Sequence, residues 1–111
     1  MVYTMDEIRD RVAPIAQKYR IPRVFVFGSY ARGEATDESD VDLLIDRTDM
    51  ASTRWYLSGV FEDFEAALGK QVDIITTQSL DQPAAQGSRA RFRDAVNRER
   101  RLVYDCARYM N

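Results

Sequence analysis

The chain has 111 residues, 45% of them apolar, which suits one domain with its own core, so we expect residues 1–111 to form a single domain. The formal net charge is −2, which gives no reason to expect broad nucleic-acid binding. The absence of histidine argues against zinc chemistry and a histidine general base, and one cysteine cannot form an internal disulfide.

The first predicted element is a helix that begins at Thr4. Thr4 and Glu7 have the spacing of a capping box, in which two side chains satisfy free backbone N–H groups at a helix start. Apolar residues then recur at helical intervals, namely Ile8, Val12, Ile15, Ala16 and Tyr19. Pro14 lacks a backbone donor, so it should kink this helix or begin a new first turn. We expect the helix to cover a sheet.

A short strand and a sharp turn follow. Residues 24–27 form an apolar run of valine and phenylalanine, which predicts a buried strand. Gly28 then lets the backbone turn sharply and approach a ligand closely. Ser29 supplies a hydroxyl and a backbone N–H, and residues 30–32 can begin a short helix whose N-terminus attracts phosphate oxygens. This stretch is therefore a predicted triphosphate cradle.

Two acids open the second predicted strand, which covers residues 41–45. Asp40 and Asp42 are two residues apart, so they project from the same face. Their side chains start about 6.6 Å apart, close enough to share two cations about 4 Å apart. Residues 34–46 hold six acids and no base. Such a cluster repels itself and any triphosphate unless cations neutralise it, so the sequence predicts a divalent metal site.

The rest of the chain supplies a crossover helix and a third acid. A helix is predicted between about residues 52 and 68, with Gly69 as its stop. One face of it carries Leu57, Val60, Phe61, Phe64 and Leu68. Residues 71–76 form a third predicted strand, and its one charge, Asp73, lies near the start. A polar loop over residues 78–87, a helix from 88 to about 99 and an edge strand over 102–104 complete the prediction.

The positions of the turn and the acids fix the strand directions. The turn ends the first strand and the acids begin the second, so the two meet at one site only if these strands are antiparallel. Asp73 also begins its strand, after a helix-length crossover, so the third strand should lie parallel to the second with a right-handed connection. The predicted fold class is α/β (α+β), with a mixed sheet flanked by helices.

The spacing of Gly28-Ser29, ten residues, then Asp40-x-Asp42, with Asp73 downstream, resembles the DNA polymerase β-like nucleotidyltransferases. Within that superfamily, residues 27–35 followed by 39–44 are similar to the minimal nucleotidyltransferase (MNT) family. The resemblance covers roughly residues 4–104. It implies the palm fold of that superfamily and the transfer of AMP from MgATP to a hydroxyl, with two Mg²⁺ ions.

The resemblance also implies a role for each site residue. Gly28 and Ser29 would hold the triphosphate, Asp40 and Asp42 would bind the two metal ions, and Asp73 would complete the metal site and help to deprotonate the acceptor. These three aspartates are the expected catalytic and metal-binding residues. Arg32 lies in the cradle and could also bind the nucleotide through its phosphates, although an arginine after a turn is as often an ordinary surface residue.

The acceptor should come from a partner, because the chain holds the catalytic unit and little else. In the MNT family the resemblance implies a HEPN-domain ribonuclease toxin, for which the MNT protein is the antitoxin. A tyrosine hydroxyl of that toxin is the expected acceptor. No membrane span or signal peptide is visible, which predicts a cytoplasmic protein without a membrane partner. Nucleic acid is not expected as a direct ligand, and a homo-oligomer or a hetero-oligomer with the partner is possible.

Two other functions stay open. One is a non-catalytic antitoxin that neutralises its partner by contact alone, against which the intact aspartates count. The other is a nucleotidyltransferase for a small molecule such as an aminoglycoside, against which the lack of an acceptor domain counts.

Two further features have no assigned role. Residues 88–111 hold seven arginines and three acids, which could bind triphosphate, RNA or an acidic partner. A solvated helix face with an Asp94–Arg98 pair is the simpler explanation. Trp55 and Tyr56 cannot both face the core, so one could mark a partner surface, although a half-buried aromatic is the simpler explanation here too.

Overall fold

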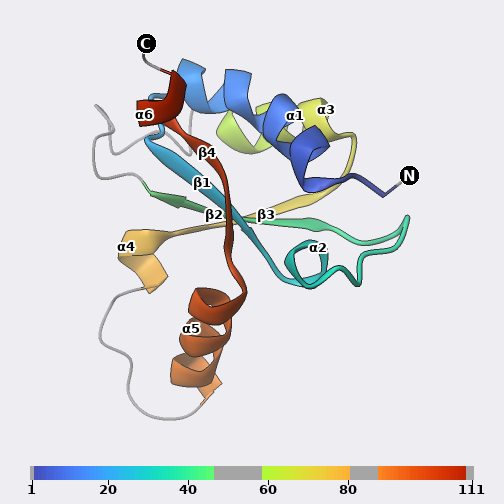
Figure 1. Ribbon diagram of the computed structural model, residues 1–111, viewed down its shortest axis with the longest axis vertical. Coiled ribbons are helices and arrows are strands. Elements are labelled where there is room, and N and C mark those ends of the chain that lie inside the picture. Colours follow the sequence, from blue (N-terminus) through green and yellow to red (C-terminus); the bar gives the residue numbers. More distant parts are fainter. Residues whose placement is uncertain (1, 47–58, 81–87, 110–111) are drawn as a thin grey trace.

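The computed structural model describes residues 2–46, 59–80 and 88–109. Figure 1 shows the arrangement of its helices and strands. In chain order they are α1 (Met5–Lys18), β1 (Arg23–Phe27), α2 (Ser29–Arg32), β2 (Val41–Asp46), α3 (Val60–Leu68), β3 (Val72–Thr76), α4 (Thr77–Leu80), α5 (Ser88–Glu99), β4 (Arg101–Asp105) and α6 (Cys106–Tyr109). None of the helices within these ranges combines the length and the apolar character that a membrane span requires.

The described strands form one mixed sheet in the order β3-β2-β1-β4. Strand β1 is antiparallel to both of its neighbours, whereas β2 and β3 are parallel. These relations confirm the predicted strand directions and the edge position of the last strand. As a consequence, the last residue of β1 and the first residues of β2 and β3 lie at the same end of the strands.

Helices cover both faces of this sheet, and each face has its own apolar core. On one face, α1 and α3 pack against alternate residues of β2, namely Val41, Leu43 and Ile45. On the other face, Phe27 and Leu44 pack against Leu80 of α4 and Val96 of α5. Because strand side chains alternate between faces, Asp42 lies on the face that α4 and α5 cover.

Helix α1 begins as predicted. The Thr4 side chain accepts a bond from the Glu7 N–H at 3.1 Å, and the Glu7 carboxylate accepts one from the Thr4 N–H at 2.9 Å, which completes the capping box. The helix continues through Pro14 as one element, so of the two predicted outcomes, a kink or a new first turn, the new first turn does not occur. Pro14 is exposed, and water can therefore hydrate the carbonyl that loses its partner.

Helix α3 confirms the predicted stop and corrects one predicted core residue. Gly69 ends the helix with a φ of +64°. Phe61 is 37% exposed, so its placement on the buried face was wrong. The buried stripe runs through positions four residues apart, at Val60, Phe64 and Leu68. The predicted helix start near residue 52, and with it Leu57, Trp55 and Tyr56, lies outside the described residues.

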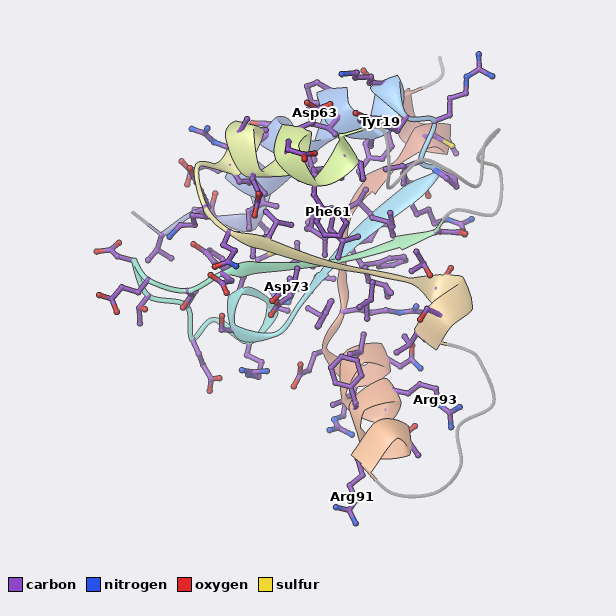
Figure 2. All side chains as sticks on the ribbon, turned by 180° about the vertical axis from the view of Figure 1, so that it is seen from behind. Tyr19, Phe61, Asp63, Asp73, Arg91 and Arg93 are labelled. Carbon is purple, nitrogen blue, oxygen red and sulfur yellow. The ribbon has the colours of Figure 1, made fainter. Side chains whose placement is uncertain are left out.

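A polar cluster joins α1 to α3. The Asp63 carboxylate accepts bonds from Lys18 Nζ at 2.8 Å and from the Tyr19 hydroxyl at 2.6 Å. Figure 2 shows Tyr19 and Asp63 next to each other where the two helices meet. These bonds lower the pKa of Asp63, the bond from Lys18 most of all. Together with the apolar contacts beneath it, this cluster fixes the helical layer on the face away from Asp42.

The C-terminal part follows the prediction with two differences. Residues 88–99 form α5, and residues 101–105 form the edge strand β4. Residues 77–80 form the helical turn α4, so the predicted loop was wrong there, and residues 81–87 lie outside the described part. Among the described residues no ion pair joins Asp94 to Arg98, so that predicted pair is absent.

Candidate active site

Three parts of the chain meet at one edge of the sheet. Phe27, the last residue of β1, pairs with Asp42 of β2, and Asp42 pairs with Asp73 of β3. Gly28 and Ser29 follow Phe27 directly. The structure therefore brings together the predicted turn and two of the three predicted acids.

Gly28 has two separate reasons to be glycine. Its φ of +74° and ψ of −150° lie in a region that is essentially restricted to glycine. A Cβ atom at this position would overlap Asp42 Oδ2 and lie 3.1 Å from Asp42 Cγ. The sequence predicted a close approach of backbone to ligand here. The structure shows that the Asp42 carboxylate occupies the space that a side chain at residue 28 would need, so the turn and the acid share one site.

The turn continues into α2, a single helical turn. The Arg32 N–H donates to the Gly28 carbonyl at 3.0 Å, and the Glu34 N–H donates to the Ser29 carbonyl at 2.9 Å. The first N–H groups of a helix have no acceptor within the helix, and the cap residue Gly28 has no side chain that could serve. These groups and the Ser29 hydroxyl are therefore donors suited to phosphate oxygens.

Asp42 has the most perturbed environment in the site. The pKa of this half-buried carboxyl is raised from 3.8 to about 6, chiefly because burial disfavours its charge. The charge and hydrogen bond of Asp73 add to the rise, as does the charge of Asp40, while Arg32 acts in the opposite direction. Two carboxylates held this close favour a bound cation, which would stabilise both charges.

Asp40 lies at the rim of the site. It precedes the first residue of β2 and is exposed, as is Asp73, which Figure 2 shows beside α2. In the part of the chain that the structure describes, no three acidic, cysteine or histidine side chains are grouped tightly enough to hold one ion. The donor set nevertheless fits Mg²⁺, which takes carboxylate oxygens as ligands. Asp42 and Asp73 form the central pair of this set of carboxylates, and Asp40 lies beside them.

Arg32 is held by two carboxylates. Its Nε lies 2.6 Å from Glu34 Oε1, and its Nη1 lies 3.2 Å from both carboxylate oxygens of Glu99 on α5. These bonds raise its pKa, the bond to Glu34 most of all. A phosphate that binds Arg32 would therefore compete with two acids, and in this structure the side chain links α2 to α5.

A cavity of about 340 Å³ adjoins the turn. Residues of the predicted site line one side of it, namely Gly28, Ser29, Arg32 and Asp42. Helix α5 lines the opposite side with Phe92, Ala95, Val96 and Glu99. Sequence reasoning missed these four residues, although the four-residue spacing of Phe92 and Val96 marks one face of a helix. A second cavity, of about 310 Å³ between α1 and β4, is not lined by Asp40, Asp42 or Asp73.

Comparison with known proteins agrees with this geometry. The chain matches the nucleotidyltransferase domain family over residues 5–103. A Methanocaldococcus jannaschii protein that is provisionally named a protein adenylyltransferase is 36% identical over 91 residues. The match covers 77% of this chain and 90% of that protein.

Solved structures give the same result. One that is provisionally described as a minimal nucleotidyltransferase superposes with a TM-score of 0.63 and 30% identity, over 89% of this chain and 95% of that chain. A chain in the complex of a tri-AMPylated Shewanella oneidensis HEPN toxin with its MNT antitoxin superposes with a TM-score of 0.61, over 95% of this chain and 76% of that chain. At 13% identity the latter match shows a shared fold alone. The chain therefore belongs to the nucleotidyltransferase domain family, as a nucleotidyltransferase of the minimal type.

Proposed function

We propose that this protein transfers AMP from MgATP to a hydroxyl of a partner protein, that the acceptor is a tyrosine of a HEPN-type ribonuclease toxin, and that it acts as the antitoxin of that partner. The observation that carries the proposal is the Gly28 turn lying against Asp42, with Asp73 beside it in register. One side of this site offers donors to phosphate, and the other offers carboxylates to a cation.

As a nucleotidyltransferase, the protein uses a nucleoside triphosphate and a divalent metal. Asp40, Asp42 and Asp73 would hold the metal, which when bound supplies positive charge that neutralises the phosphates. Ser29 and the turn orient the triphosphate so that the acceptor approaches the α-phosphorus in line with the leaving group.

The transfer forms one bond and breaks another. The acceptor oxygen bonds to the α-phosphorus, the bond from that phosphorus to the bridging oxygen breaks, and pyrophosphate leaves. The exposed Asp73 carboxylate takes the proton of the acceptor hydroxyl, since it lies where an acceptor can arrive from solvent. Asp42 keeps a raised pKa only while no cation is present, so a bound metal would leave it ionised.

A protein acceptor agrees with the openness of the site. Asp40 and Asp73 are both exposed, so a docked surface could bring its own hydroxyl to the acids. Docking makes such a transfer effectively intramolecular, which favours it by proximity. The provisional name of the Methanocaldococcus relative and the AMPylated toxin in the Shewanella complex support this choice of acceptor.

The test uses the purified protein and its HEPN-type partner. The pair is incubated with Mg²⁺ and each of the four nucleoside triphosphates, and the intact mass of the partner is measured. We expect additions of AMP with ATP, and none with the Asp40→Asn, Asp42→Asn double variant. A matched control replaces two exposed acids of α1, Asp6→Asn with Asp10→Asn, and should keep full activity.

Inhibition of the partner separates the enzyme from a binding module. If the double variant still inhibits the ribonuclease and no mass is added by the parent protein, the protein neutralises its partner by contact and the transferase proposal is wrong. If the parent instead modifies a small hydroxylated molecule and leaves the protein unmodified, the acceptor assignment is wrong.

A further inference from the structure

We propose that the cavity between α2 and α5 holds the base and ribose of the nucleotide, and that the base stacks on Phe92. The inference rests on the proposed function, because it takes the triphosphate to lie at Gly28 and the acids. It adds a binding role for α5, a helix to which neither the motif nor the family match assigns one.

The cavity is continuous with the phosphate site. Gly28 and Ser29 of the predicted cradle, and Asp42 of the predicted metal site, also line the cavity. A nucleotide whose phosphates lie at the turn would therefore have its nucleoside within reach of α5. The volume of about 340 Å³ lies within the range of about 300 to 1,000 Å³ that small-molecule sites occupy.

The lining changes character from one side to the other. The turn and Asp42 are polar or charged, whereas α5 contributes the apolar Phe92, Ala95 and Val96, together with Glu99, whose carboxylate is paired with Arg32. A nucleotide has the same asymmetry, with charged phosphates at one end and a flat aromatic base at the other. The side of the cavity opposite the acids therefore suits the base.

Phe92 is placed as a stacking platform. It is 48% exposed although it is a large apolar residue, and it lies on α5 between Arg91 and Arg93, which project from the same helix in Figure 2. Its ring meets that of Phe27 in an edge-to-face contact with the centroids 6.2 Å apart. Phe27 is only 7% exposed, so this contact anchors Phe92 to the core while much of its surface stays available.

Two further contacts hold α5 against the turn. Val96 is buried among Phe27, Leu44 and Leu80, which fixes the helix on the sheet. Glu99 bonds Arg32 of α2 through both carboxylate oxygens. The Val96 and Glu99 contacts hold α5 in place against the sheet and against α2. The Phe92 ring is therefore in position before a ligand arrives.

Calorimetry with two ligands tests the inference. MgATP carries a base, whereas inorganic tripolyphosphate with Mg²⁺ carries phosphates alone. We expect Phe92→Ala to weaken MgATP binding about 5- to 150-fold, the range for loss of one stacked base, and to change tripolyphosphate binding less than about twofold. Phe92→Tyr, which keeps an aromatic face, should bind MgATP nearly as well as the parent.

The matched control is Phe61→Ala. Phe61 is an exposed aromatic on α3, which packs on the other face of the sheet, and its loss should change neither affinity. Unchanged MgATP affinity in Phe92→Ala would overturn the inference and leave the proposed function standing. An equal loss for both ligands would also overturn it, since Phe92 would then act on the phosphate site or the fold. If the parent protein binds neither ligand, the proposed function itself fails.

Discussion

Asp42 and Asp73 occupy paired positions on the parallel strands β2 and β3, and they share this edge of the sheet with the Gly28 turn. Asp42 also pairs with Phe27, the residue before Gly28. Burial and the charge of Asp73 together raise the pKa of Asp42 to about 6, so the two acids repel one another when no cation is bound. This one relationship places the turn that we propose to bind phosphate beside the acids that we propose to bind the metal.

Because Gly28 lies against Asp42, we expect one methyl group added at residue 28 to reduce both the stability of the fold and nucleotide binding. Gly28→Ala should destabilise the fold by about 1 to 3 kcal/mol through backbone strain alone, with a further cost because the new Cβ would overlap the Asp42 carboxylate. Nucleotide binding should weaken as Asp42 is displaced. Chemical denaturation and calorimetry measure the two effects.

Gly33→Ala is the matched control for that variant. Gly33 has the same φ of +74°, but its ψ of 24° lies in the left-handed helical region, and no atom beyond its chain neighbours lies within 4 Å of the Cβ that alanine would add. Gly33→Ala should therefore show a smaller backbone strain without the overlap, and should retain nucleotide binding. Equal losses in the two variants would contradict the proposed role of the Gly28–Asp42 contact.

The raised pKa of Asp42 predicts how the stability of the metal-free protein depends on pH. Its pKa in the folded protein, about 6, exceeds the ordinary value of 3.8, so the folded state binds more protons between these values. The favourable contribution of Asp42 to the free energy of unfolding is fully present below pH 3.8 and is lost as the pH rises through 6. The full shift corresponds to roughly 3 kcal/mol, and we expect about half of that because Asp42 is partly exposed.

Unfolding in EDTA at several pH values measures this effect. The parent should lose stability relative to Asp42→Asn between pH 4 and 7, because the amide cannot ionise. Added Mg²⁺ should stabilise the parent more at pH 7 than at pH 5, since a cation binds the ionised carboxylate. A stability difference between parent and variant that stays constant with pH would contradict the raised pKa.

Ser29 should contribute to binding and not to the fold. Ser29→Ala should remove one hydrogen bond to a charged phosphate, which is worth about 1.5 to 3 kcal/mol, so MgATP affinity should fall about 10- to 150-fold. Ser79→Ala, at an exposed serine of α4, is the control and should have no effect. Parent-like affinity in Ser29→Ala would remove this residue from the phosphate site.

Asp73 should act in turnover more than in stability. It is exposed, so Asp73→Asn should leave the melting temperature within a few degrees of the parent, while AMP transfer should fall by at least about a hundredfold. Steady-state rates with the partner protein, alongside a thermal melt, separate the two effects. Normal turnover would show Asp73 to be only a charge at the sheet edge.

The sequence predicted what depends on local pattern. The turn at the end of one strand and acids at the starts of two others were enough to predict the strand directions, because only one arrangement brings them together. The sequence did not predict features that depend on contacts between residues far apart in the chain. Arg32 and Glu99 are 67 positions apart, and nothing in the local pattern of α5 shows that this helix lines the site.

Smaller errors have physical causes as well. Phe61 fits the helical period loosely, but the buried stripe follows positions four residues apart and leaves it partly exposed. The second strand was predicted over residues 41–45, and β2 begins at Val41 as predicted and ends one residue later, at Asp46. Asp40 precedes the strand and lies at the exposed rim of the site.

The central claim is that the turn and the acids form one site for a metal-bound nucleoside triphosphate. Calorimetric titration of ATP into the parent and into the Asp40→Asn, Asp42→Asn variant, each with Mg²⁺ and with EDTA, tests it most directly. We predict tight binding only for the parent with Mg²⁺, and a loss of more than about a hundredfold in the double variant, since it lacks two charged metal ligands. If the variant binds MgATP as tightly as the parent, or if the parent binds equally well in EDTA, the site is not the one described.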